Sequence, residues 1–329
     1  MSLRTEKQNV GHKLMRIYGI DFTSAPSHNK PITCAECKLQ DNRLRVQNCL
    51  KLVSFDDFEA LLRSGGPWLA ALDFPFGQPR KLISNLEWPE TWEGYVQIVA
   101  SMGKKEFEET LIRYGESRTI GDKLHLRVTD VLAEARSPMM LHRVPVGKMF
   151  FEGATRLLKS DVSILPCRPT RNNRIVVEGY PALVARRFVG KRSYKSDKRG
   201  KQIKDREEAR RKIVSGLSSS EMVDWYGFGV ELLEELSKRL VEDAMGDKLD
   251  AILCSVQSGW AYMQRDRGYG IPEVCDKREG WIVDPFWGHL RLQAIESGDQ
   301  DMSFRESYKK GSVCAAIICN KSCNPCRAP

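Results

Sequence analysis

The chain has 329 residues, of which 41% are hydrophobic and 29% are charged. This usage is ordinary for globular proteins, so it excludes a chain that is disordered throughout and leaves room for a substantial core in one or two domains. No stretch approaches the roughly 18 consecutive apolar residues of a membrane span, and the first residues lack the apolar core of a secretory signal, so we expect a cytoplasmic protein.

The net charge of +9 belongs to one segment of the chain. Residues 186–212 contain 13 Lys and Arg against 4 Asp and Glu, whereas the rest of the chain has 39 residues of each sign. A local basic strip suits a polyanion such as nucleic acid, although a solvated loop is the alternative. Lys195, Lys198 and Lys201 are predicted to contact phosphate, with Tyr194 stacking on a base.

The N-terminal part of the chain predicts three strands and a helix. Residues 15–21 form an apolar run that ends in an acid, and 30–39 and 43–53 predict a hairpin of two half-buried strands. Residues 54–65 begin with a Ser N-cap, carry acids in the first turn and end at Gly, which predicts a helix.

The same succession of strand, acid and turn recurs later in the chain. Residues 67–73 predict a buried parallel strand that ends in an acid, and 174–178 predict another, with Pro181 starting the following helix. The region from about 80 to 171 predicts a helical insertion. Further helices are expected over 205–217, 229–245 and 246–265.

This order of elements is typical of an α/β fold of the ribonuclease H-like kind. It predicts a mixed five-stranded sheet in the order 3-2-1-4-5, flanked by helices and interrupted by the large helical insertion. We expect residues 1–14 to be an N-terminal extension, 15–290 to form the domain, and 291–329 to form a poorly ordered tail.

Four acids are candidates for a metal site: Asp21, Asp73, Glu178 and Asp250. The first and fourth strands are neighbours in this order and their ends form the crevice where α/β sheets bind ligands. Clustered carboxylates repel one another unless a cation neutralises them, and they are the ligands that Mg²⁺ or Mn²⁺ prefers. Two such ions would serve hydrolysis of a phosphodiester.

Each of these acids also has a purely structural interpretation. Asp21 and Asp73 precede turn-forming residues and could form Asx-turns. Glu178 could pair with Arg174, and Asp250 could complement the dipole of its helix, with Asp247 as the N-cap.

Several segments together resemble a known family: YGIDFTSAP, ALDFPFGQPR, RSPMM, VPVGKMFFEG, VVEGYPALVAR, DAILCSVQSGWA and EGWIVDP. They are similar to the domain of unknown function 429 family, classed as predicted ribonuclease H-like nucleases, over about residues 16–285. The resemblance implies the ribonuclease H-like fold and places the four acids at its metal site. It also draws attention to Arg127, Asp130, Arg136 and Lys148, of which Arg127 and Lys148 are taken as candidate phosphate contacts.

Other functions remain open on the sequence. The residues from Asp21 to Ser24 resemble the first phosphate loop of the related actin and sugar-kinase fold, which would make the chain a phosphotransferase or nucleotide-binding protein. A non-catalytic nucleic-acid-binding module is a third possibility. Zinc at Cys34 and Cys37, or at the C-terminal cysteines 314, 319, 323 and 326, is a weaker hypothesis.

Overall fold

The computed structural model describes residues 15–196 and 203–287. The chain divides into a unit over residues 1–284 and a second unit over 285–329, of which residues 285–287 are described. The expected N-terminal extension and C-terminal tail, Lys198, Lys201 and the four C-terminal cysteines lie outside the described residues.

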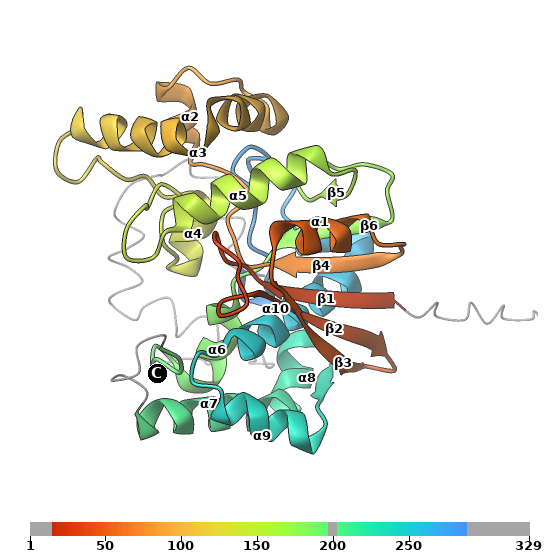
Figure 1. The fold of residues 1–329 in the computed structure, drawn as a ribbon. Helices are drawn as coiled ribbons and strands as arrows, with labels where there is room; N and C mark the ends of the chain where they lie inside the picture. Colours follow the sequence, from red (N-terminus) through yellow and green to blue (C-terminus); the bar gives the residue numbers. More distant parts are fainter. Residues whose placement is uncertain (1–14, 197–202, 288–329) are drawn as a thin grey trace, which may run out of the picture. The chain divides into compact units, whose positions relative to one another are not determined.

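Within the described residues, seven strands form one mixed sheet in the order β5-β6-β4-β1-β2-β3-β7 (Figure 1), so the α/β class is as predicted. β1 pairs antiparallel with β2 and parallel with β4, and β6 pairs parallel with β4. The short strands β5 and β7 pair parallel with β6 and β3 at the two edges. The bounds are β1 Met15–Asp21, β2 Ile32–Gln40, β3 Arg43–Leu52, β4 Trp68–Leu72, β5 Ser163–Ile164, β6 Arg174–Glu178 and β7 Gly229–Glu231.

The β2–β3 hairpin is the one predicted from the alternation of apolar residues. Its two-residue turn consists of Asp41 and Asn42, which have φ angles of 50° and 55°. Asp and Asn tolerate this left-handed conformation, which matches the twist of paired strands. The turn sets the register of the hairpin from Gln40 and Arg43 as far as Cys37 and Val46, beyond which the pairing shifts by one residue.

Helices cover both faces of the sheet and form the insertion between β4 and β6. Their bounds are α1 Phe55–Arg63, α2 Arg80–Asn85, α3 Trp92–Glu116, α4 Val128–Ala133, α5 Val146–Lys159, α6 Pro181–Val189, α7 Lys204–Leu217, α8 Ser220–Tyr226, α9 Glu234–Glu242 and α10 Asp247–Met263. Two differences from the prediction stand out. The segment predicted as one helix over 229–245 contains β7 before α9, and the insertion contributes the edge strand β5.

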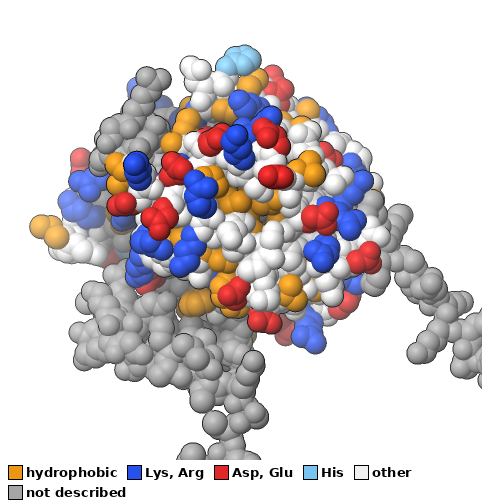
Figure 2. All heavy atoms as spheres, turned by 90° about the horizontal axis from the view of Figure 1, so that it is seen from below, with side chains coloured by type: hydrophobic (Ala, Val, Ile, Leu, Met, Phe, Trp, Pro, Cys, Tyr) orange, Lys and Arg blue, Asp and Glu red, His pale blue; other side chains and the backbone are white. Residues whose placement is uncertain are grey.

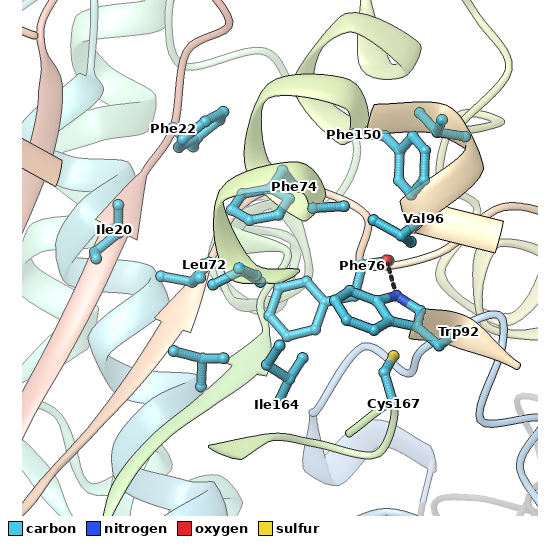
Figure 3. Packing of buried hydrophobic residues seen from close by; sticks show 14 of the residues in the cluster. Ile20, Phe22, Leu72, Phe74, Phe76, Trp92, Val96, Phe150, Ile164 and Cys167 are labelled. Carbon is cyan, nitrogen blue, oxygen red and sulfur yellow. Dashed lines mark hydrogen bonds between the residues drawn. The ribbon is translucent and has the colours of Figure 1, made fainter. Parts of the chain in front are cut away.

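The larger apolar core lies between the sheet, α1 and the helical insertion. Phe22, Phe74 and Phe76 extend from the ends of β1 and β4 toward Phe150 of α5 and Trp92 of α3 (Figure 3). The Trp92 indole donates a hydrogen bond to the carbonyl oxygen of Phe76 at 2.7 Å. A tilted aromatic contact between Phe22 and Phe74, with ring centroids 4.6 Å apart, joins the ends of β1 and β4, beside which the Trp92 hydrogen bond holds the insertion.

The opposite face of the sheet is covered by α10, which packs on β1, β2 and β4 (Figure 1). Its close approach depends on Gly19. A Cβ atom at Gly19 would lie 2.1 Å from both the Ala251 carbonyl oxygen and the Ser255 nitrogen, so only glycine fits. This contact brings the first turn of α10, with Asp250, next to the end of β1.

None of the helices in the described part of the chain combines the length and the apolar character of a membrane span.

Candidate acidic site at the carboxyl ends of the strands

Three of the four predicted acids lie together on the α10 side of the sheet. Asp21 ends β1, Asp73 directly follows β4, and Asp250 lies in the first turn of α10. Side chains alternate between the faces of a strand, so Asp21 shares the face of Gly19, against which α10 packs. We call Asp21, Asp73 and Asp250 the acidic cluster.

Asp21 and Asp73 have carboxylates without partners. Neither forms a side-chain hydrogen bond or ion pair with another described residue, although Asp21 is only 8% exposed and Asp73 is partly buried. Burial, reinforced by the charges of Asp250 and Asp73, raises the pKa of Asp21 well above its ordinary value despite the opposing pull of Lys195. Burial, with Asp250 and Glu178 as neighbours, raises the pKa of Asp73 to about 7. Burial is the largest cause of both raised pKa values, and the neighbouring carboxylates add to it.

Asp250, in contrast, is fully buried and fully engaged. The Tyr194 hydroxyl donates to Asp250 Oδ1 at 2.6 Å, and the Lys195 ammonium forms an ion pair with Oδ2. Burial opposes the charge of Lys195, but Asp250 and Asp21 outweigh it and hold the pKa of Lys195 well above its ordinary value. Tyr194 and Lys195, which belong to the predicted basic strip, therefore contact the acidic cluster; the Lys195 side chain is 41% exposed, and its contact with phosphate stays a prediction.

A second ion pair lies at the start of α10. Lys30 Nζ is 2.8 Å from Asp247 Oδ1, which connects the loop before β2 to this helix. Gly246 is the N-cap residue of α10, and Asp247 is the first helical residue. The prediction that Asp247 is the N-cap is therefore wrong.

Glu178 lies near Asp73 but on the side of the sheet that faces the insertion. The Arg127 guanidinium donates hydrogen bonds to both carboxylate oxygens of Glu178. The two distances are 2.6 and 2.8 Å, and the backbone N–H of Phe76 adds a third hydrogen bond at 2.9 Å. The partner of Glu178 is thus Arg127 and not Arg174. In this arrangement the carboxylate already has its counter-charge, unlike Asp21 and Asp73.

Arg127 joins three parts of the fold in one buried network. Besides Glu178 it pairs with Asp130 at 2.7 Å and donates to the carbonyl oxygen of Glu279 at 2.8 Å. Although burial opposes its charge, Asp130 and Glu178 hold the pKa of Arg127 well above its ordinary value. Arg127 is 1% exposed, so it cannot reach a substrate phosphate here, and the expectation for this residue is corrected to a structural one.

The described part of the basic strip is only partly tied into the fold, since Lys191, Arg192, Lys204, Arg211 and Lys212 are exposed. Arg210 is buried and donates to the carbonyl oxygens of Tyr194 and Val241, while Arg187 pairs with the buried Asp284 at 3.2 Å. Among the described side chains on the face on the side of α7 and α9, Lys and Arg are interspersed with Asp and Glu (Figure 2). The predicted phosphate contact Lys148 lies on α5 and pairs with Glu108 at 3.0 Å; its binding role stays a prediction.

Arg136, which follows α4, lies near Tyr180 at the end of β6. Gly179, directly after β6, donates its N–H to the Leu72 carbonyl oxygen at 2.9 Å, so Tyr180 follows close to Asp73. Burial raises the pKa of the Tyr180 hydroxyl; the nearby charge of Asp73 raises this pKa further, and that of Arg136 lowers it. Arg136 is exposed and forms no hydrogen bond or ion pair with another described residue. Arg136 is among the insertion residues to which the family resemblance drew attention, and its side chain is accessible to a ligand.

The donor chemistry of the acidic cluster suits a hard divalent cation, because carboxylate oxygens are the preferred ligands of Mg²⁺ and Mn²⁺. As the side chains lie, no group of three or more His, Cys, Asp or Glu in the described ranges is arranged to hold a metal ion. Cys34 and Cys37 are buried in β2, and burial raises the pKa of the Cys37 thiol to about 12, which disfavours the thiolate that zinc needs.

Comparisons of the chain with protein-family models, with curated proteins and with solved structures give no significant match, so the assignment of function depends on the geometry of this site.

Proposed function

We propose that the chain is a metal-dependent nuclease, in which Asp21, Asp73 and Asp250 bind Mg²⁺ or Mn²⁺ for the hydrolysis of a phosphodiester in nucleic acid. The observation that carries the proposal is the pair of carboxylates on Asp21 and Asp73, which are withdrawn from water beside Asp250 without a hydrogen-bond partner. Burial of such unpaired groups costs stability, which makes them candidates for a ligand-binding role.

The strand order gives further support to a ribonuclease H-like assignment. Without the short edge strands, the sheet runs β3-β2-β1-β4-β6, which corresponds to the expected order 3-2-1-4-5. The acidic cluster lies where β1 and β4 end, the location at which α/β sheets of this kind bind ligands. The resemblance to the domain of unknown function 429 family is part of the same proposal.

Each residue of the site has a defined part in the proposed reaction. A bound divalent ion would lower the pKa of water and stabilise charge on the leaving oxygen. Tyr194 and Lys195 fix the orientation of Asp250. Asp21 and Asp73 would supply carboxylate oxygens to the ion. Arg136 can hold a phosphate of the substrate on the Tyr180 side.

The test is cleavage of labelled single-stranded, double-stranded and branched DNA and RNA with Mg²⁺ or Mn²⁺. We expect metal-dependent cleavage that falls by more than about 100-fold in Asp21→Asn and in Asp73→Asn. Asp122→Asn is the matched control, because Asp122 is an acid of the insertion that pairs with Lys81 and Arg118. Cleavage that persists in both cluster variants, or in EDTA, contradicts the proposal. Metal-dependent binding of nucleic acid without cleavage would favour the non-catalytic binding module.

A further inference from the structure

We propose that Lys195 is a resident cation of the acidic cluster and limits the cluster to one divalent ion, in place of the two expected from the sequence. The inference rests on the proposed function, because it specifies the metal content of the same site.

The first step is the position of the Lys195 ammonium group. It pairs with Oδ2 of Asp250, which has no exposed surface, while the other oxygen of Asp250 accepts from Tyr194 at 2.6 Å. The charge of Lys195 also acts on Asp21 and Asp73. Lys195 therefore forms an ion pair with one carboxylate of the cluster, and its charge lowers the pKa of the other two.

The second step is that the backbone fixes this position. Ser196 N–H donates to the Ala244 carbonyl oxygen at 3.0 Å, and Arg210 donates to the Tyr194 carbonyl oxygen at 2.8 Å. Gly246, with φ of +77°, lies so close that an added Cβ would be 3.0 Å from the Cβ of Lys195. Lys195 is therefore packed against the loop before α10, and its contact with Asp250 is part of the fold.

The third step is the balance of charge. Asp247 already pairs with Lys30 and does not need a further cation. When ionised, Asp21, Asp73 and Asp250 carry three negative charges, and Lys195 supplies one positive charge. The remaining two equal the charge of one divalent ion. The Asp21 carboxylate is 8% exposed and has no partner among the described residues, so we expect the ion to bind at Asp21. A second divalent ion would meet an excess of positive charge next to Lys195.

The test is titration of the full chain with Mn²⁺, followed by calorimetry and by electron paramagnetic resonance of free Mn²⁺. We expect one Mn²⁺ per wild-type chain, lost in Asp21→Asn. Lys195→Gln should bind the first Mn²⁺ at least about tenfold more tightly, because a positive charge next to the ion is removed. Lys195→Arg should keep the wild-type affinity, and Lys30→Gln, which removes the cation on Asp247, should change it less than Lys195→Gln does.

The outcomes separate this inference from the proposed function. Two Mn²⁺ ions per wild-type chain, or an unchanged affinity in folded Lys195→Gln, would overturn the role of Lys195 and leave the nuclease proposal standing. Because the wild-type stoichiometry needs no variant, the inference stays testable even if Lys195→Gln does not fold. Absence of Mn²⁺ binding in both the wild type and Lys195→Gln would overturn the proposed function and, with it, this inference.

Discussion

Replacement of Asp73 by Asn should stabilise the metal-free protein at neutral and alkaline pH. Asp73 has a partly buried carboxylate without a partner, and its pKa lies at about 7 in the folded protein instead of the ordinary 3.8. A raised carboxyl pKa means that the folded state binds the proton more tightly than the unfolded state does. Ionisation of Asp73 therefore lowers the free energy of unfolding as the pH rises from 3.8 to 7.

The magnitude follows from the two pKa values. Their difference corresponds to about 4 kcal/mol, which is an upper limit because the side chain is partly exposed. We expect Asp73→Asn to exceed the wild type in free energy of unfolding by about 1 to 4 kcal/mol at pH 8 in EDTA. At pH 5 less than half of this difference should remain, and below pH 3.8 it should vanish.

Urea unfolding followed by circular dichroism measures this difference. Asp122→Asn is the control, because hydrogen bonds from Lys81 and Arg118 lower the pKa of Asp122 to about 2. The stabilisation by Asp122 is lost only as the pH falls from 3.8 through 2, so this variant should be less stable than the wild type by the same amount at pH 5 and pH 8. Saturating Mn²⁺ should reduce the advantage of Asp73→Asn, since the ion binds the ionised wild-type site. Equal stability of wild type and Asp73→Asn at pH 8 would refute the reasoning.

Three further substitutions test the ion pairs, the helix packing and the helix cap around the acidic cluster. Arg127→Met leaves Glu178 and Asp130 buried without a cation and should cost about 3 to 5 kcal/mol in urea unfolding; a loss below about 1 kcal/mol would show that the network contributes little. Gly19→Ala places a Cβ 2.1 Å from backbone atoms of α10, so we expect a loss of about 3 kcal/mol or more in thermal unfolding, and an unchanged midpoint would contradict the close packing of α10 on β1. Ser54→Ala removes the cap of α1 and should cost about 1 kcal/mol by chemical denaturation, with no effect on Mn²⁺ affinity.

The central strands could be predicted because their apolar runs are long enough to show a pattern and end in acids. The edge strands β5 and β7 could not, since two and three residues are too few to establish a period of two. Val230 of β7 is buried where β7 pairs with β3 and packs against α7 and α8, and these are tertiary contacts.

The arrangement of the four acids was only partly predictable because the face of each acid depends on strand register. Glu178 pairs in register with Leu72, and Leu72 with Ile20, so Glu178 lies one position before the level of Asp73 and Asp21 and faces the other side. A shift by one residue exchanges the two faces of a strand, and the register is known only once the strands are paired. The place of Lys195 depends likewise on the contact of residues 194–196 with the loop before α10.

Crystals soaked in Mn²⁺ and measured for anomalous scattering test the central claim most directly. The proposed site predicts one strong anomalous peak within about 2.5 Å of carboxylate oxygens of Asp21 and Asp73, on the α10 side of the sheet. A peak on Glu178 and the insertion instead, or no peak near the acidic cluster at saturating Mn²⁺, would contradict the assignment.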